Sequence, residues 1–123
     1  MAYEWDNKKP TAQMLGRWQP FHEGHYNLFK EIIKKTGQVC IQIRDVQGID
    51  DNPFDFDTIK KNIEKRLNPE FEGHFKIMVV PNITNICYGR GVGYKIEEIV
   101  LDEKTQQISA TKIREQMRKE GKL

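Results

Sequence analysis

Short apolar runs alternate with helical patterns along the first eighty residues, and this alternation limits the folds open to the chain. The apolar runs have the length of strands and lie at residues 12–15, 39–43 and 75–80. The segments between them, residues 25–35 and 56–67, carry apolar side chains at helical spacing. Strands and helices in this order require right-handed crossovers, so we expect an α/β domain with a parallel sheet.

The pattern is less regular after Pro81. We expect residues 83–88 and 94–101 to form two further short strands, joined by the glycine-rich turn at residues 89–93. A last helix is expected over residues 109–120. The sheet should therefore contain about five strands flanked by helices.

The chain length of 123 residues is that of one domain. We assign residues 11–123 to this domain and residues 1–10, which are polar and irregular, to a flexible N-terminal arm. Tyr3 and Trp5 of the arm could dock on the domain or on a second copy, and a homo-oligomer is one expectation.

Charge and cysteine content narrow the classes of function. Twenty basic and 18 acidic residues leave a net charge of +2, which gives no support to a general binder of nucleic acid. Cys40 and Cys87 are far apart and flanked by apolar residues, so we expect free, buried thiols rather than a disulfide. The sequence contains no membrane-length apolar run and no signal peptide, which predicts a cytoplasmic protein without a membrane partner.

Two histidines mark the junction between the first strand and the first helix. His22 and His25 are separated by Glu23 and Gly24, at a place where a helix start offers free backbone N–H groups to an anion. Imidazole N–H groups donate hydrogen bonds to phosphate oxygens, and glycine permits a close approach of a ligand to the backbone. The segment therefore predicts a triphosphate site. A zinc site is disfavoured because His-Glu-Gly-His lacks the spacing of two metal ligands on a helix, and no metal bound directly by protein ligands is expected.

Two sequence blocks carry a family resemblance. Residues 16–25, Gly-Arg-Trp-Gln-Pro-Phe-His-Glu-Gly-His, closely resemble the signature of the HxGH nucleotidyltransferase superfamily. Residues 108–114, Ile-Ser-Ala-Thr-Lys-Ile-Arg, resemble the second motif of that superfamily, and both blocks stand in the family's order. The sequences Asn52-Pro53-Phe54 and Val80-Pro81-Asn82-Ile83 also resemble archaeal-type nicotinamide-nucleotide adenylyltransferases.

The resemblance implies a single Rossmann-like domain and a role for each motif residue. His22 and His25 would stabilise the α- and β-phosphates, and Arg114 would hold the leaving pyrophosphate. The nucleotide-binding set would comprise Gly16, Arg17, Trp18, Gly24, Arg90, Ser109, Ala110 and Thr111.

The acceptor side of the site is less defined. Asn52 and Phe54 would face the acceptor by analogy. The arginine that many adenylyltransferases carry a few residues later is replaced by the run Ile59, Lys60 and Lys61, so the identity of the acceptor stays open.

The function expected from the resemblance is transfer of a nucleoside monophosphate from an NTP to a small phosphorylated acceptor, with release of pyrophosphate. Mg²⁺ is expected with the NTP because it offsets phosphate charge. ATP is favoured over CTP, since residues 16–22 are closer to the openings of adenylyltransferases. A cytidylyltransferase and an inactive nucleotide-binding regulatory module remain the alternatives.

Overall fold

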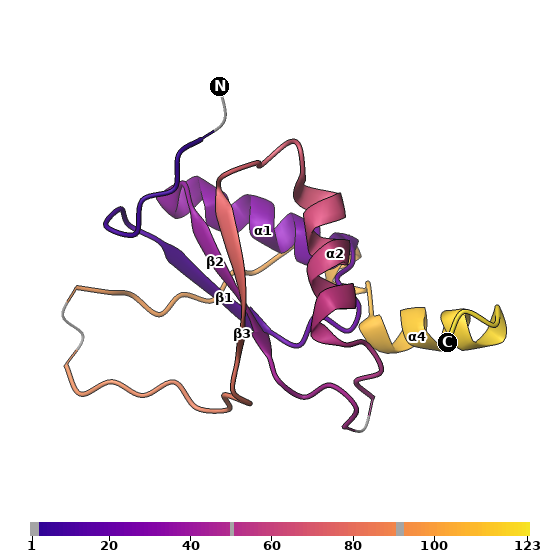
Figure 1. The fold of residues 1–123 in the computed structure, drawn as a ribbon. Coiled ribbons are helices and arrows are strands. Elements are labelled where there is room, and N and C mark those ends of the chain that lie inside the picture. The colour runs from indigo at the N-terminus through magenta and orange to yellow at the C-terminus, as the bar shows by residue number, and fades with distance from the viewer. Residues whose placement is uncertain (1–2, 50, 91–92) are drawn as a thin grey trace.

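The computed structural model describes residues 3–49, 51–90 and 93–123, and its regular elements are those of an α/β fold (Figure 1). In chain order they are β1 (Ala12–Gly16), α1 (Glu23–Thr36), β2 (Val39–Arg44), α2 (Phe56–Leu67), β3 (Phe75–Val80), α3 (Glu103–Gln106) and α4 (Ala110–Lys119). The three strands pair in parallel in the order β1-β2-β3. The α/β class and the parallel sheet are thereby confirmed.

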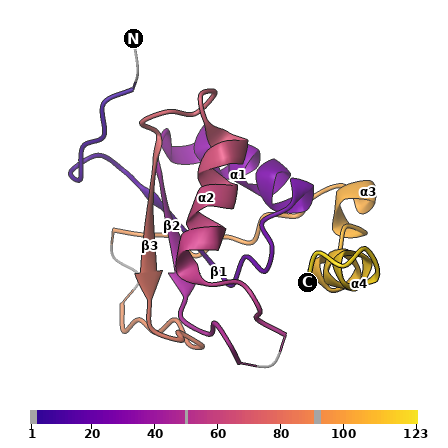
Figure 2. The ribbon, with the colours of Figure 1, turned by 45° about the vertical axis from the view of Figure 1, so that its right-hand side comes forward.

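Helices α1 and α2 cover the same face of this sheet (Figures 1 and 2). Val39, Ile41 and Ile43 alternate toward the helices along β2, and they pack in one core with Phe29 of α1 and Ile63 of α2. Both crossovers carry their helix to this side, and within the described ranges the opposite face of the sheet has no helix on it (Figure 2). The carboxyl ends of the strands lead into the loops that contain the motif residues.

The prediction of about five strands is wrong for the part of the chain that the structure describes. The two segments predicted as strands, residues 83–88 and 94–101, have no strand conformation and pair neither with β1 nor with each other. Ile86 is 59% exposed and Val100 is 76% exposed, so their side chains have no buried face to pack against. A strand needs both a hydrogen-bonded neighbour and such a face, and an apolar run alone supplies neither.

The C-terminal helix was predicted at nearly its observed place. Ser109 is the N-cap of α4 and accepts from the backbone N–H of Lys112 at 3.3 Å. The apolar residues Ile113 and Met117 are only half-buried, whereas Arg114 is the buried residue of the helix. The short helix α3 was not expected, because a single turn capped by an aspartate has no apolar periodicity.

The N-terminal arm contacts the amino ends of the strands. The ring of Tyr3 stacks on His74 with centroids 4.1 Å apart, and its hydroxyl donates to Gln38 at 3.1 Å. The Gln38 amide in turn donates to the carbonyl of Asp6 at 2.8 Å. Residues 3–6 therefore lie at the end of the sheet opposite the motif loops.

Both cysteines are free thiols. The expected burial is wrong for both: Cys40 is only half-buried, and Cys87 is exposed because its segment does not join the sheet. None of the helices in the described ranges has the length and apolar character needed to cross a membrane.

Candidate functional site

Gln19 ties together three segments that lie far apart in the sequence. Its side-chain amide donates to the carbonyl of Phe54 at 2.9 Å and accepts from the backbone N–H of Phe54 at 2.9 Å. The backbone carbonyl of Gln19 accepts a hydrogen bond from Arg114 of α4. The loop after β1, the loop after β2 and the C-terminal helix therefore meet at one place.

His22 and His25 stack on each other, with ring centroids 3.6 Å apart and planes 19° from parallel. The His22 Nδ1 accepts from the backbone N–H of Gly24 at 3.0 Å, and the His25 Nδ1 accepts from the backbone N–H of His22 at 3.2 Å. The two imidazoles together cap the start of α1, which explains why the helix begins at Glu23 rather than at residue 25.

These contacts decide the protonation of the pair. An Nδ1 that accepts a hydrogen bond carries no proton, so each neutral ring bears its proton on Nε2. Burial, with a smaller contribution from the neighbouring His22, lowers the pKa of His25 to about 3. Burial also lowers the pKa of His22. At neutral pH the site thus presents two uncharged Nε2–H donors.

Trp18 lies behind the histidine pair. Its ring meets His25 edge-on with centroids 4.7 Å apart, and its indole N–H donates to the carbonyl of Gln42 at 3.0 Å. Trp18 also has a φ of 54°, which is rare for a bulky side chain and holds the ring under the site. The residue therefore positions His25.

Each of the two motif glycines is required by a ring of the protein itself. A Cβ at Gly24 would lie 2.8 Å from the His22 ring, and a Cβ at Gly16 would lie 2.7 Å from the Trp18 ring. The small residues therefore make room for the imidazole and the indole. Their contact with a nucleotide stays a prediction.

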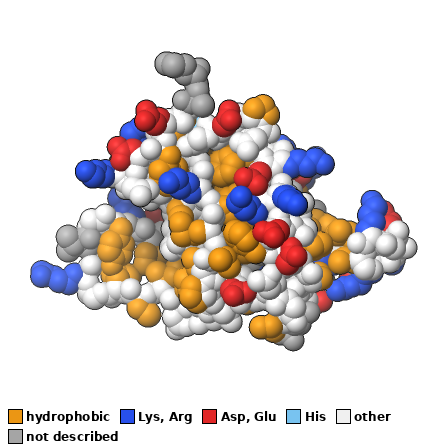
Figure 3. Space-filling model, in the orientation of Figure 1, with side chains coloured by type: hydrophobic (Ala, Val, Ile, Leu, Met, Phe, Trp, Pro, Cys, Tyr) orange, Lys and Arg blue, Asp and Glu red, His pale blue; other side chains and the backbone are white. Residues whose placement is uncertain are grey.

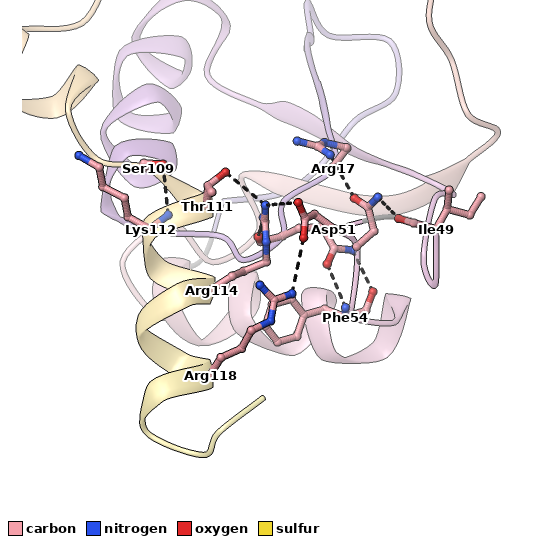
Figure 4. Close-up of polar contacts among 11 residues, drawn as sticks. Arg17, Ile49, Asp51, Phe54, Ser109, Thr111, Lys112, Arg114 and Arg118 are labelled. Atoms are coloured by element: carbon pink, nitrogen blue, oxygen red, sulfur yellow. Dashed lines mark hydrogen bonds and ion pairs between the residues drawn. The ribbon is translucent and has the colours of Figure 1, made fainter.

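Arg114 is 2% exposed, and its guanidinium lies beside a carboxylate (Figure 4). Its guanidinium donates to the Gln19 carbonyl and, at 3.3 Å, to the hydroxyl of Thr111. Asp51, in the loop after β2, stands 3.9 Å from Arg114 and 3.5 Å from Arg118. The Nε of Arg114 has no hydrogen-bond partner among the described residues. Two guanidinium groups thus converge on one anionic group.

The remaining predicted residues divide into two groups. Ser109, Ala110 and Thr111 form the start of α4 next to Arg114, whereas Lys112 extends away from it (Figure 4). Arg90 is exposed in the extended segment that Figures 1 and 2 place on the side opposite α4. The structure does not bring Arg90 to the histidines.

The two predicted acceptor residues have different surroundings. Asn52 is buried and holds the loop after β2, since it accepts from Arg17 at 3.4 Å and donates to the carbonyl of Ile49. Phe54 is half-buried and lines a cavity beside His22.

Sequence reasoning missed an anchor for the start of α1. Arg66 of α2 forms two hydrogen bonds with the Glu23 carboxylate, at 2.6 and 2.7 Å, and lies 3.5 Å above the ring of Tyr26. The bonded guanidinium holds the pKa of Glu23 below its usual range. No motif links residues 43 positions apart in this way, so only the fold could show the pair.

The described residues contain no group of three His, Cys, Asp or Glu side chains that could hold a metal ion.

Comparison with known proteins gives partial matches of one kind, and no family model matches the chain. The chain is 44% identical over 45 residues to the nicotinamide-nucleotide adenylyltransferase of Methanococcus aeolicus, which covers 35% of this chain and 26% of that protein. It is 44% identical over 36 residues to the enzyme of the same name from Methanococcus maripaludis, covering 29% and 21%. A third match, to the enzyme of Methanolobus tindarius, has 44% identity over 45 residues. The matched stretch thus spans about a quarter or less of each relative.

These matches support a relationship with nucleotidyltransferases. The α/β fold with a parallel sheet is consistent with that relationship.

Proposed function

We propose that this protein is an adenylyltransferase that moves AMP from ATP to a phosphate oxygen of a small phosphorylated acceptor. The acceptor oxygen forms a bond to the α-phosphorus, the bond from that phosphorus to the bridging oxygen breaks, and pyrophosphate leaves with the electron pair. Catalysis of such a step depends on positioning and on stabilisation of charge, with little covalent help from the protein.

The stacked histidine pair is the observation that carries this proposal. Backbone N–H groups occupy both Nδ1 atoms, so both Nε2–H groups are free to donate to non-bridging oxygens of the α-phosphate. Since the pKa of His25 is about 3, the ring remains a neutral donor at any physiological pH and needs no proton before each turnover.

Arg114 and the start of α4 would hold the leaving phosphates. The guanidinium is prepositioned by Gln19 and Thr111, and phosphate oxygens would replace the Asp51 carboxylate that now faces it. Mg²⁺ bound to the triphosphate would lower the charge on the pyrophosphate. Because the described residues contain no group of three possible metal ligands, phosphate oxygens would supply most of the ligands of the ion.

Release of pyrophosphate tests the proposal. Purified protein is incubated with Mg²⁺, either ATP or CTP, and nicotinamide mononucleotide, the acceptor suggested by the names of the partial relatives. We expect pyrophosphate with ATP and acceptor together, and calorimetric titration should show tighter binding of ATP than of CTP. Tenfold tighter binding of CTP, or about 1.4 kcal/mol, would instead indicate a cytidylyltransferase. Binding of a triphosphate without turnover of any phosphorylated acceptor would indicate a regulatory module.

A further inference from the structure

The first turn of α1 is tied to α2 by one ion pair. Glu23 follows directly on His22, the N-cap of α1, and its carboxylate accepts two hydrogen bonds from Arg66 of α2, at 2.6 and 2.7 Å. It is the shortest ion pair among the described residues. Both side chains are partly exposed, and exposed ion pairs contribute little to the stability of a fold. What this pair fixes is therefore the place of the turn relative to α2, rather than the stability of the fold.

Arg66 is itself held in one orientation. Its guanidinium lies 3.5 Å from the centre of the Tyr26 ring, and Tyr26 is buried in the core. The hydroxyl of Tyr26 donates to Glu70, in the connection from α2 to β3, at 2.5 Å. A planar guanidinium that stacks on a fixed ring and binds a carboxylate at two points has few other orientations available. Arg66 therefore reaches Glu23 from a fixed place and not as a mobile side chain of the surface.

The turn that Arg66 holds is the one that orients the two histidines. The His22 ring accepts from the backbone N–H of Gly24, and the His25 ring accepts from the backbone N–H of His22. These N–H groups belong to the end of a helix, where the backbone has no partner within the helix and frays readily. A tie from outside the helix limits this fraying, and Glu23 supplies it. The direction of both Nε2–H groups thus depends on a contact with α2.

We propose that Arg66 is a positioning residue for the histidine pair and acts on it through Glu23. By holding the first turn of α1 against α2, it keeps the Nε2–H groups of His22 and His25 directed at the same phosphate. Arg66 itself touches neither the nucleotide nor the acceptor. This role rests on the proposed function, because a fixed direction of the two donors matters for a charge that develops in the transition state.

Steady-state rates of pyrophosphate release, measured with and without Glu23, test this role. Arg66→Gln should lower kcat about tenfold when Glu23 is present, because a small displacement of the donors is costly. In the Glu23→Ala protein, which has already lost the tie, the same replacement should change kcat and the KM for ATP by less than about twofold. A side chain that binds substrate directly would instead show its effect in both backgrounds.

Hydrogen exchange of two backbone amides tests the positioning without turnover. The amides of His22 and Gly24 donate to the imidazole rings, and Arg66→Gln alters no residue near them in the sequence. Loosening of the turn should raise their exchange rates about tenfold, as measured by NMR. Lys34→Gln is the matched control. It breaks the exposed pair of Lys34 with Glu31 at 3.1 Å, in the last turns of α1, and should change neither the exchange rates nor kcat.

This role and the adenylyltransferase proposal can fail separately. If both amides exchange at the same rate in R66Q as in the unaltered protein, Arg66 does not position the histidine pair. The same conclusion follows if an active protein keeps its kcat in R66Q, or loses as much in the Glu23→Ala background. If the amides exchange faster in R66Q but the unaltered protein releases no pyrophosphate with ATP and any phosphorylated acceptor, Arg66 still positions the histidines and the adenylyltransferase proposal falls.

Discussion

Residues 12–80 and residues 81–101 have similar apolar runs but different structures. In the first region each run lies under a helix, and Val39 and Ile41 of β2 are fully buried. In the second region Ile86 and Ile96 are both 59% exposed, and the chain there touches the rest of the molecule through few groups, such as Ile99 and the Lys35–Glu97 ion pair. Figure 3 shows the resulting apolar patch at the lower left. A β-branched run becomes a strand only where packing covers it.

The comparison also shows in which of the two regions the candidate site residues lie. The two histidines, Gln19 and Asp51 all follow strands of the covered region, and α4 returns to the same edge of the sheet. Arg90, the one predicted nucleotide contact in the exposed region, is not brought to that edge. The following predictions test whether function and stability are confined to the covered region.

Replacement of His22 or His25 by Ala should have the largest effect. Loss of one prepositioned donor to the α-phosphate should reduce kcat by roughly 10²–10³. His74→Ala is the matched control, because His74 stacks on Tyr3 at the other end of the sheet and should leave kcat unchanged. The measurement is the rate of pyrophosphate release, with thermal melting to check the fold. Full activity in either site variant would remove that histidine from the mechanism.

The low pKa of His25 predicts a loss of stability in mild acid. In the unfolded chain this imidazole takes up a proton near pH 6.5, whereas in the fold it does so only near pH 3. The unfolded state therefore binds more protons between these values, and the free energy of unfolding should fall by about 1.4 kcal/mol per pH unit as the pH drops below 6.5.

Urea unfolding at pH 6.5 and pH 5 measures this effect. Because carboxylates also begin to titrate in this window, the comparison is with His25→Gln, which should lose about 2 kcal/mol less between the two pH values. If the free energy of unfolding falls equally in the unaltered protein and in His25→Gln, the ring of His25 is solvated in the folded state.

The sequence predicted most of the covered region because its information is local. The spacing of apolar residues predicted β1 to β3, α1 and α2, and the last helix was predicted within a residue of each end of α4. The same local view failed for Arg114, which the helical pattern could not show to be the buried residue of α4, and for its partner Asp51. An ion pair that spans 63 positions depends on how the loops fold over the sheet, and nothing in either local sequence specifies it.

Arg114→Lys should weaken the binding of ATP far more than the binding of AMP. Lysine keeps the positive charge but lacks the planar guanidinium with its several N–H groups. It therefore cannot donate hydrogen bonds to Gln19, Thr111 and a phosphate at the same time. We expect a roughly tenfold rise in the Kd of ATP and a much smaller one for AMP, measured by calorimetry. Lys119→Gln, at the end of the same helix, should change neither value. Equal losses for ATP and AMP would place Arg114 away from the leaving phosphates.

The smallest expected effect is on the free energy of unfolding, and it compares the two regions directly. Ile63 of α2 is fully buried and Ile96 is 59% exposed, so the same removal of one methylene should have unequal results. Ile63→Val should lower the free energy of unfolding by about 0.5–1.5 kcal/mol, because it leaves a void among close-packed side chains. Ile96→Val should change it by less than about 0.5 kcal/mol, since water already surrounds that side chain. Urea unfolding at pH 7 gives both values. An equal cost at Ile96 would mean that residues 94–101 are packed in solution as a strand, which would restore the larger sheet that the apolar pattern predicted.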